Sequence, residues 1–334
     1  MRTPVGIADL STYTPHRFVS ASEISAASGV PAEVLIEKFG LAGKHVAEGD
    51  EHVSDMCISA ARPLLARHDA ADVGAVIYFG SHWKDYLVWQ AAPKIQSALG
   101  IEGFSLELIN VSAGAPVALK VVADMLSADE DLRDVLLVGA SKESHLVDFA
   151  NERGRFMFNF GDGAVAALLS RGADRNLILG SHLLTDGSFS DHVRMTGGGS
   201  RHPASHETVD AGLHKLDLVE GAEMKRRLDP ITKKNFIEVA RVALERSGLS
   251  LSDLDVVLPI HMKRSLHDDL LAELGAERSI YLDHFGHMSA VDPLFSLCVA
   301  RDEGLIDDGD VILLLAAGTG YTWAASVVRW GSAV

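Results

Sequence analysis

The sequence predicts an α/β fold made of two similar halves, and three observations support this prediction. Strand-like and helix-like segments alternate along almost the whole chain. The order of these segments in the first half returns in the second. The chain has 334 residues, of which 47% are hydrophobic, so it is too long for one small core and apolar enough to bury a large one.

The predicted strands are short runs of apolar and β-branched residues between turn residues. Helical patterns fill the gaps, most clearly after Ala115, after Asp229 and after Ser289. Gly248 and Gly304 mark the ends of the last two helices. Because parallel strands need long crossovers, this alternation predicts a largely parallel sheet covered by helices. The predicted strands cover residues 73–80, 105–111, 134–139, 164–170, 177–184, 255–260, 279–282, 310–316 and 321–328.

Two pairs of segments show the repeat most directly. VGAVIYFGS (73–81) resembles LDVVLPIHM (254–262), and DVLLVGAS (134–141) resembles DVILLLAAG (310–318). Within each half, a short strand, a turn and a helix lie between the first of these segments and the second. This order indicates an internal duplication.

The repeat also predicts where the halves meet. The first turn contains Ser112 and the second contains His287, so a two-fold relation between the halves would bring these residues face to face. We expect the halves to comprise residues 1–172 and 173–334. The Gly-, His- and Ser-rich segment 196–207 is expected to form a loop or lid.

Composition and charge exclude several classes of function. Acidic residues outnumber basic ones by 46 to 30, and a net charge of −16 repels phosphate backbones and anionic lipid, so we expect neither nucleic acid nor a membrane as a partner. Only Cys57 and Cys298 occur, both in apolar helix-like stretches, so neither a disulfide framework nor a cysteine nucleophile is expected. The chain starts without a signal-peptide pattern, and no stretch approaches the roughly 18 uninterrupted apolar residues of a membrane span. We therefore expect a cytoplasmic protein.

Three residues form a candidate catalytic set. Ser112 lies between a strand and a helix with Pro116 in its first turn, where the positive helix end suits a developing anion; a simple N-cap is the alternative. His261 ends a predicted strand, and parallel sheets present side chains beyond that edge. His287 precedes its helix as Ser112 precedes its own. A lone histidine here is usually structural, but the three positions together favour a catalytic site.

Other motifs are less specific. His284 and His287 form an H-x-x-H pair, but no cysteine pair or carboxylate completes a ligand set, so we expect no metal, and no phosphate-binding loop or bound cofactor either. Gly318, Thr319 and Gly320 end a buried strand. There the backbone N–H of Gly320 could stabilise an oxyanion, or the segment could be a plain turn.

Nine segments, spread over almost the whole chain, are similar to segments of a known family. Their order and spacing resemble the thiolase superfamily, specifically the ketoacyl-acyl-carrier-protein synthase III branch of condensing enzymes. The resemblance implies a thiolase-like fold with two duplicated α/β halves in an α-β-α-β-α arrangement. It also implies a homodimer, in which residues 86–90, with Val88 at their centre, reach the partner's acyl pocket. The segments are VSDMCISAA (53–61), KIQSALGI (94–101), NVSAGAPVALKVV (110–122), VLLVGAS (135–141), FGDGAVAALL (160–169), HLLTDGSFSD (182–191), LPIH (258–261), GHMSAVDPLFSL (286–297) and GTGYTWAASVVRW (318–330).

The resemblance implies a Ser–His–His set in place of the branch's Cys–His–Asn. The family's cysteine precedes Ala-Gly, where this chain has Ser112. The first catalytic histidine matches His261, and the asparagine of the G-N-x-S-A context matches His287. On this basis we expect His261 to be the general base and His287 to stabilise the thioester or enolate oxygen. The backbone amides of Ser112 and Gly320 would form the oxyanion hole.

The residues implied at the tunnel mouth also differ from the family pattern. Val34 and Lys38 replace the aromatic residue and the arginine that grip coenzyme A, and Arg264 falls in the replaced H-Q-A-N segment. Lys225 and Arg226, followed by Arg227, lie where the family receives the phosphopantetheine of its carrier protein. These positions favour a carrier-protein thioester as the donor. Alternatively, the basic residues 225–227 are only a run of solvent-exposed charges.

The expected activity is acyl transfer from a coenzyme A or carrier-protein thioester, through an ester on Ser112, to an amine or hydroxyl acceptor in a specialised biosynthetic pathway. A serine hydroxyl needs a base, and its ester is less electrophilic than a thioester, so attack by a carbanion should be slow. One alternative is decarboxylative condensation with a malonyl thioester, giving a 3-oxoacyl product. A second alternative is a non-catalytic subunit of a heterodimeric synthase.

Overall fold

One sheet of nine strands forms the frame of the structure, a computed structural model that describes residues 3–332. Its strand order is β11-β12-β13-β8-β1-β7-β6-β4-β5. Two small antiparallel pairs, β2 with β3 and β9 with β10, lie outside it. The strands are β1 Val5–Tyr13, β2 Arg17–Ser20, β3 Gly43–Val46, β4 Val73–Tyr78, β5 Phe104–Glu107, β6 Asp134–Ser141, β7 Gly163–Arg171, β8 Arg175–Thr185, β9 Val193–Met195, β10 Leu216–Leu218, β11 Val256–Pro259, β12 Val311–Gly318 and β13 Thr322–Ser332.

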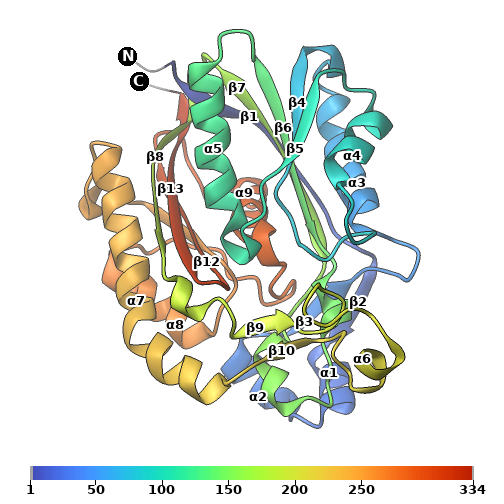
Figure 1. Ribbon diagram of the computed structural model, residues 1–334. Coiled ribbons are helices and arrows are strands. Elements are labelled where there is room, and N and C mark those ends of the chain that lie inside the picture. The colour runs from blue at the N-terminus through green and yellow to red at the C-terminus, as the bar shows by residue number, and fades with distance from the viewer. Residues whose placement is uncertain (1–2, 333–334) are drawn as a thin grey trace.

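The large sheet bends apart between its two halves, and helices fill the gap (Figure 1). Strands β1 and β8 join the halves through a single pairing, Gly6 with Leu177. Helix α5 contacts strands on both sides, α3 and α4 cover the outer face of the first half, and α7, with α8 packed on it, covers the second. The predicted α-β-α-β-α layering is confirmed. The helices are α1 Ala21–Ser28, α2 Ala32–Phe39, α3 Val53–Leu65, α4 Ala91–Leu99, α5 Gly114–Ala128, α6 His206–Asp210, α7 Gly221–Arg246, α8 Arg264–Leu274 and α9 Asp292–Asp302.

The prediction of a largely parallel sheet is wrong. Only the pairs β4–β5, β4–β6 and β11–β12 of the described sheet are parallel. The central strands pair antiparallel. The short connection between β12 and β13, for example, cannot make the crossover that a parallel pair needs. Residues 279–282 form no strand, although Arg278 makes an isolated bridge to Val256. The predicted division after residue 172 falls in the turn between β7 and β8.

Helix α5 is the central element of the middle layer. Its buried face, including Ala118, Leu119 and Val122, belongs to the largest cluster of the core. By length and composition alone, Val111–Ala128 is apolar enough to cross a membrane. Half of this stretch is buried inside the protein, as expected of a core helix, so the segment is weak evidence for a span.

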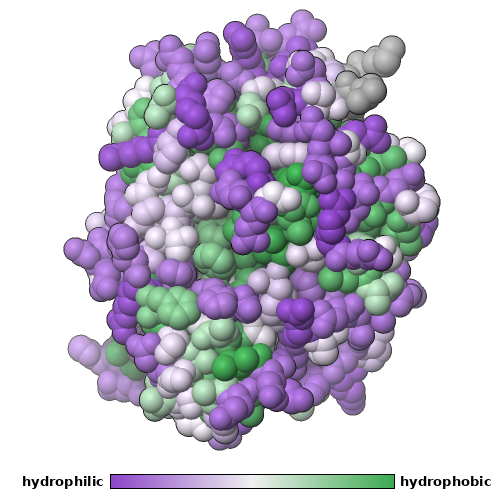
Figure 2. All heavy atoms as spheres, turned by 180° about the vertical axis from the view of Figure 1, so that it is seen from behind, coloured by the Kyte–Doolittle hydropathy of each residue, from purple (hydrophilic) through white to green (hydrophobic). Residues whose placement is uncertain are grey.

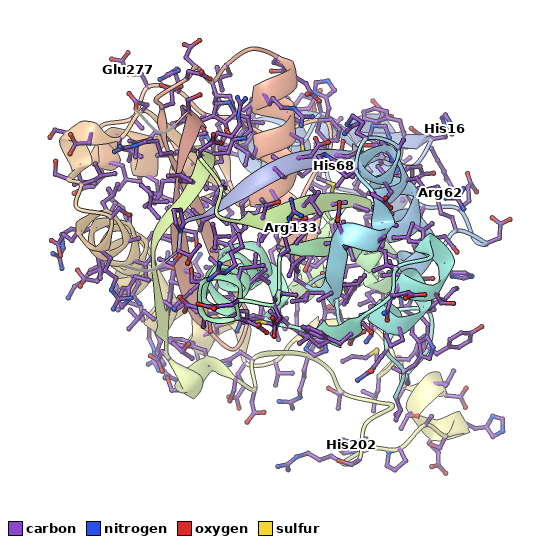
Figure 3. The ribbon with its side chains drawn as sticks, turned by 90° about the horizontal axis from the view of Figure 1, so that it is seen from above. His16, Arg62, His68, Arg133, His202 and Glu277 are labelled. Atoms are coloured by element: carbon purple, nitrogen blue, oxygen red, sulfur yellow. The ribbon has the colours of Figure 1, made fainter. Side chains whose placement is uncertain are left out.

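The molecule has a mostly hydrophilic surface on its rear face, and one segment projects from its body. Seen from behind, most of the surface is hydrophilic, with hydrophobic side chains exposed near the middle of this face (Figure 2). Seen from above, the segment that carries His202 extends away from the sheet (Figure 3). Residues 196–205 form turns and loop, as predicted, and α6 begins at His206.

Candidate active site

Ser112 lies in the 3-10 turn Val111–Ala113, between β5 and the start of α5. Its side chain is buried, so a reaction there is shielded from bulk water. Gly114 makes this location possible, because a Cβ atom there would lie 2.7 Å from Cβ of Ala290 and 2.8 Å from the carbonyl oxygen of Phe79. The turn that carries Ser112 therefore packs directly against the turn that follows His287.

The side chain of His287 joins Ser112 to a buried carboxylate. The Ser112 Oγ atom lies 2.8 Å from Nε2 of His287, and Nδ1 of His287 lies 2.6 Å from Oδ2 of Asp292. A carboxylate accepts hydrogen bonds only, so the proton of a neutral His287 ring lies on Nδ1. The lone pair on Nε2 is then directed at the serine hydroxyl, the arrangement of a Ser–His–Asp triad.

Asp292 is held firmly at the first position of α9. Oδ1 accepts the backbone N–H of Met288 at 2.7 Å, and Oδ2 also accepts the backbone N–H of His261 at 2.8 Å. The carboxylate is fully buried. Burial alone would lower the pKa of His287, but the charge and hydrogen bond of Asp292 outweigh it and raise this pKa above its ordinary value.

His261 occupies a different environment. Within the described residues, neither ring nitrogen of this buried side chain has a hydrogen-bond partner. Burial lowers its pKa to about 4, so the ring is neutral at physiological pH. Our prediction that His261 is the base next to Ser112 does not fit this geometry, because the histidine bonded to Ser112 is His287. The predicted meeting of the Ser112 and His287 turns is confirmed.

Two cavities meet at Ser112. The first, which we call the apolar chamber, has a volume of about 350 Å³. The second, the histidine chamber, has a volume of about 370 Å³. Ser112, Phe156, Phe160 and Thr319 line both. The apolar chamber is also lined by His82, Trp83, Leu87, Val111, Glu143, Leu146, Val193, Arg194, Met195 and Leu216, and the histidine chamber by Phe39, Asn159, Leu228, Asp229, Thr232, Phe236, Ile260, His261, Met262, Lys263, Leu266, His287, Ala317 and Tyr321.

This arrangement separates two binding functions. The walls of the apolar chamber are mostly aromatic and aliphatic, which suits a hydrocarbon chain. The histidine chamber also carries polar side chains, among them Asp229, His261 and Lys263. A group attached to Ser112 can extend into the first while a second reactant approaches through the other.

The strand end near Gly320 approaches the nucleophile turn closely. A Cβ atom at Gly318 would lie 2.8 Å from the backbone nitrogen of Ala113 and 2.8 Å from the carbonyl oxygen of Asn110, so only glycine allows this approach. Thr319 follows and lines both chambers. The role of the Ser112 and Gly320 amides as an oxyanion hole stays a prediction.

The residues predicted to grip the donor lie around the histidine chamber rather than in it. Val34 and Lys38 are exposed on α2, and Phe39 of the same helix lines the chamber. Arg264 pairs with Asp268 at 3.0 Å and stacks 4.6 Å from the centre of the Tyr281 ring, while the neighbouring Lys263 lines the chamber.

Lys225 and Arg226 are exposed near the start of α7, just before Leu228, which lines the histidine chamber. Val88 is fully exposed, and its neighbour Leu87 lines the apolar chamber. The predicted contact of this segment with a second subunit stays a prediction, as does the homodimer.

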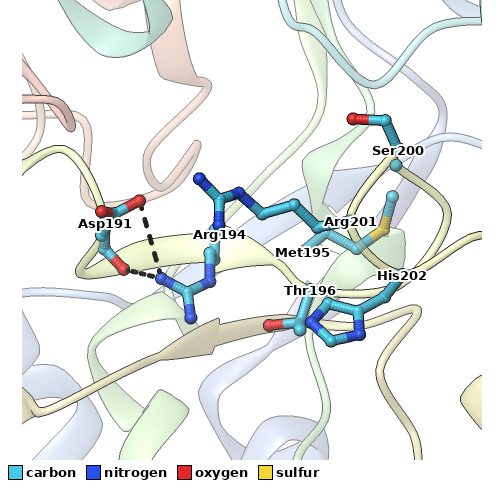
Figure 4. A pocket seen from close by; sticks show the side chains of 8 residues that line it. Asp191, Arg194, Met195, Thr196, Ser200, Arg201 and His202 are labelled. Atoms are coloured by element: carbon cyan, nitrogen blue, oxygen red, sulfur yellow. Dashed lines mark hydrogen bonds and ion pairs between the residues drawn. The ribbon is translucent and has the colours of Figure 1, made fainter.

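Strand β9 closes one side of the apolar chamber. Val193, Arg194 and Met195 all line it, and the last two also face a depression on the surface (Figure 4). In that depression Nη1 of Arg194 donates to the carbonyl oxygen of Asp191 at 2.6 Å. Arg194 is thus engaged by its own loop.

Two further polar residues of this site, Asp292 and Glu143, were not predicted from the sequence. Asp292 follows His287 by five residues and precedes Pro293, and an acidic residue inside the otherwise apolar segment DPLFSL was the available signal. Glu143 is buried just after β6 and lines the apolar chamber. As expected, neither cysteine is placed to react: both are buried, and burial raises the pKa of Cys298 to about 12.

Comparison with protein families gives a consistent result. The model of the 3-oxoacyl-[acyl-carrier-protein (ACP)] synthase III family matches residues 106–187, which include Ser112. The model of the C-terminal part of the same protein matches residues 244–330, which include both histidines and Asp292. The two matches together span about half of the chain.

Individual relatives match almost the whole chain. The beta-ketoacyl-[acyl-carrier-protein] synthase III of Syntrophomonas wolfei is 28% identical over 332 residues, covering 98% of each protein. The protein of that name from Rhodospirillum centenum is 29% identical and covers 95% of this chain and 96% of its own.

Solved structures agree with this result. The beta-ketoacyl-[acyl carrier protein] synthase III of Thermus thermophilus, 27% identical, superposes with a TM-score of 0.84 over 98% of this chain and 99% of its own. The priming beta-ketosynthase of the R1128 polyketide biosynthetic pathway, 23% identical, superposes with a TM-score of 0.85 over 100% of this chain and 98% of its own, a likeness of fold alone. These superpositions confirm the predicted thiolase-like fold.

Proposed function

We propose that this chain, which belongs to the 3-oxoacyl-[acyl-carrier-protein] synthase III family of condensing enzymes, transfers an acyl group from a thioester to an acceptor through an ester on Ser112. The observation that carries the proposal is the buried line of hydrogen bonds from Ser112 through His287 to Asp292. A serine hydroxyl attacks a thioester only when a base takes its proton, and this line supplies the base.

We assign the base to His287 and thereby exchange the roles that the sequence suggested for the two histidines. As Ser112 Oγ bonds to the acyl carbon, its proton passes to Nε2 of His287. The carbon–sulfur bond breaks, and the leaving thiolate takes that proton from the imidazolium, which releases a free thiol. Asp292 stabilises the imidazolium while it exists. An acceptor amine or hydroxyl then attacks the acyl carbon of the ester in the same way. His287 takes the proton of the acceptor and returns it to the oxygen of Ser112, which leaves as the free hydroxyl.

In this scheme His261 would act as a hydrogen-bond donor to a bound reactant and not as a base. It is neutral because of burial, so one ring nitrogen carries an N–H, which the protein encloses without a hydrogen-bond partner in the wall of the histidine chamber. A neutral donor there supports binding of the carbonyl oxygen of the incoming thioester or acceptor. The position of Lys225 and Arg226 beside this chamber supports binding of the phosphate of a phosphopantetheine arm, which coenzyme A and carrier proteins share.

Decarboxylative condensation is the second candidate, since its 3-oxoacyl product is the kind of product that the names of the relatives, beta-ketoacyl synthases, indicate. An enolate oxygen needs two hydrogen-bond donors. In a neutral His287 ring, the contact between Nδ1 and Asp292 leaves Nε2 as an acceptor, so neutral His287 is poorly suited to be one of them. A non-catalytic subunit is less well supported, because such a subunit has no use for a buried serine, histidine and carboxylate held in line.

One experiment separates transfer from condensation. The protein is incubated with an acyl thioester, once with a panel of amines and alcohols and once with a malonyl thioester. We expect new amides or esters in the first mixture and little carbon dioxide or 3-oxoacyl product in the second. Rapid release of carbon dioxide with formation of a 3-oxoacyl product would refute the proposal in favour of a serine ketosynthase.

A further inference from the structure

The apolar chamber contains one buried carboxyl group that the proposed reaction does not use. Among the residues that line this chamber, only Ser112 and Glu143 are buried polar side chains. Glu143 opens the 3-10 turn Glu143–Leu146 that follows β6. A carboxyl group is costly to bury unless its oxygens are hydrogen-bonded, so its partners indicate its role.

The two oxygens of Glu143 have different surroundings. Oε1 accepts hydrogen bonds from the hydroxyls of Ser81 at 2.6 Å and Ser289 at 3.2 Å. Oε2 has no hydrogen-bond partner within residues 3–332, and it is not among the side-chain atoms that the protein encloses completely. Because Glu143 lines the apolar chamber, Oε2 is the oxygen presented to the chamber. The protein thus fixes the carboxyl group through one oxygen and leaves the other for a ligand.

Glu143 lies near the reacting end of the chamber. Its partner Ser289 follows His287 by two residues, and the turn that contains Ser289 packs against the turn of Ser112. Glu143 and His287 are also close enough for their charges to interact. Glu143 therefore belongs to the part of the chamber wall near Ser112, where the carbonyl end of an acyl group on Ser112 would lie.

The other polar residues of the chamber do not satisfy Oε2. Arg194 is bonded to the carbonyl oxygen of Asp191 and also lies 3.8 Å from its carboxylate. His82 and Thr319 are more exposed than Glu143 and make none of its hydrogen bonds. An acyl chain of methylene groups alone would displace water from Oε2 and leave the oxygen without a partner.

We propose that Glu143 selects an acyl group that carries a hydroxyl near its carbonyl end. This inference rests on the ester at Ser112 proposed above. Burial raises the pKa of the Glu143 carboxyl group above its ordinary value. A hydroxyl fits both forms, since it donates to a carboxylate and accepts from a carboxylic acid. A site that hydrogen-bonds a substrate hydroxyl discriminates strongly against the analogue that lacks it.

The test is a competition in one tube between N-acetylcysteamine thioesters. Equal amounts of 3-hydroxybutyryl and butyryl donors, and separately 2-hydroxybutyryl and butyryl donors, are offered to the protein, using both enantiomers. Intact-protein mass spectrometry then gives the ratio of the two acyl adducts. We expect one hydroxyacyl donor to be favoured by about 10- to 100-fold, the effect of leaving one buried polar group unpaired. Because the ratio is internal, a general loss of activity does not change it.

Variants separate selection from structural support. Glu143→Leu should reverse the ratio in favour of butyryl, whereas Glu143→Gln, which keeps an oxygen for Ser81 and Ser289, should retain part of the preference. Leu146→Ala is the matched control, because it enlarges the same chamber without changing a polar group, so the ratio should stay as in the wild type. A preference that survives Glu143→Leu would refute the role of Glu143.

A comparison on the wild-type protein alone stays decisive if Glu143→Leu does not fold. The 3-methylbutyryl donor replaces the hydroxyl with a methyl group of similar size, and it should lose to 3-hydroxybutyryl. Equal adducts from these two donors, together with no preference in the 2-hydroxy series, would overturn the inference. No adduct from any donor would instead refute the ester on Ser112, and the inference with it.

Discussion

The hydroxyl oxygen of Ser112 lies 2.8 Å from Nε2 of His287, although 175 residues separate them in the sequence. Each residue precedes the inner helix of its own half: Ser112 lies in the turn before α5, and His287 lies in the loop that leads to α9. The duplicated fold thus places a nucleophile and its base at the junction of the halves. Asp292 adds the carboxylate that fixes the base.

Acylation should become slower as the pH falls. Protonated His287 cannot take the proton of Ser112, and Asp292 raises the pKa of His287 above its ordinary value of 6.5, so the inflection of the rate should lie above that pH. Asp292→Asn removes the charge, so the inflection should move to lower pH and the rate should fall. Rates of adduct formation across the neutral range measure both effects. An inflection that stays in place or moves upward in the variant contradicts the assignment.

The two histidines should differ in their effect on acylation. His287→Ala removes the base and should slow adduct formation by about 10²- to 10⁴-fold. His261→Ala should slow it less, because His261 makes no hydrogen bond to Ser112 in the structure. Single-turnover rates with one donor provide the comparison. The reverse order would return the role of base to His261.

Ser112→Cys should raise condensation with a malonyl thioester. The change keeps the geometry and converts the acyl ester into a thioester, which a carbanion attacks more readily. Release of carbon dioxide and formation of the 3-oxoacyl product are measured for both proteins with the same donor. Equal or lower condensation by the cysteine variant would show that the native serine already suits that reaction.

Gly161→Ala should destabilise the fold and displace His287. A Cβ atom at Gly161 would lie 2.1 Å from the carbonyl oxygen of Phe285, and the backbone N–H of Gly161 donates to the carbonyl oxygen of His287 at 3.0 Å. We expect the free energy of unfolding to fall by about 1–3 kcal/mol, with slower acylation. Gly49→Ala is the control, since nothing lies within 4 Å of its Cβ position. Equal denaturation midpoints for the two variants would contradict the packing argument.

The sequence predicted the strands that consist of continuous apolar runs, such as β4, β6 and β12. It did not reveal β1, whose nine residues include Asp9, Ser11 and Thr12, although this strand lies near the centre of the sheet. The short pairs β2–β3 and β9–β10 have three or four residues a strand, too few for a period to be visible. The directions of the strands were not predicted correctly. They depend on the lengths of the connections, and the prediction used only the alternation of strands and helices.

The repeat predicted the pairing of Ser112 with His287, because it depends on backbone position. The base could not be assigned in this way, since that depends on which ring nitrogen faces the serine and what holds the other. Asp292 accepts hydrogen bonds from His261, His287 and Met288, so its role arises from tertiary packing. Acidic residues are common at the start of helices, where they interact favourably with the helix dipole. The sequence alone therefore does not distinguish Asp292 as the partner of His287.

The most direct test of the account is the location of the acyl group after incubation with an acyl thioester. Intact-protein mass spectrometry should show a gain of one acyl group, and peptide mapping should place it on Ser112. Ser112→Ala should abolish the gain while the variant unfolds at the same temperature as the wild type. A gain that survives Ser112→Ala, or that maps to Cys57 or Cys298, would show that Ser112 is not the nucleophile.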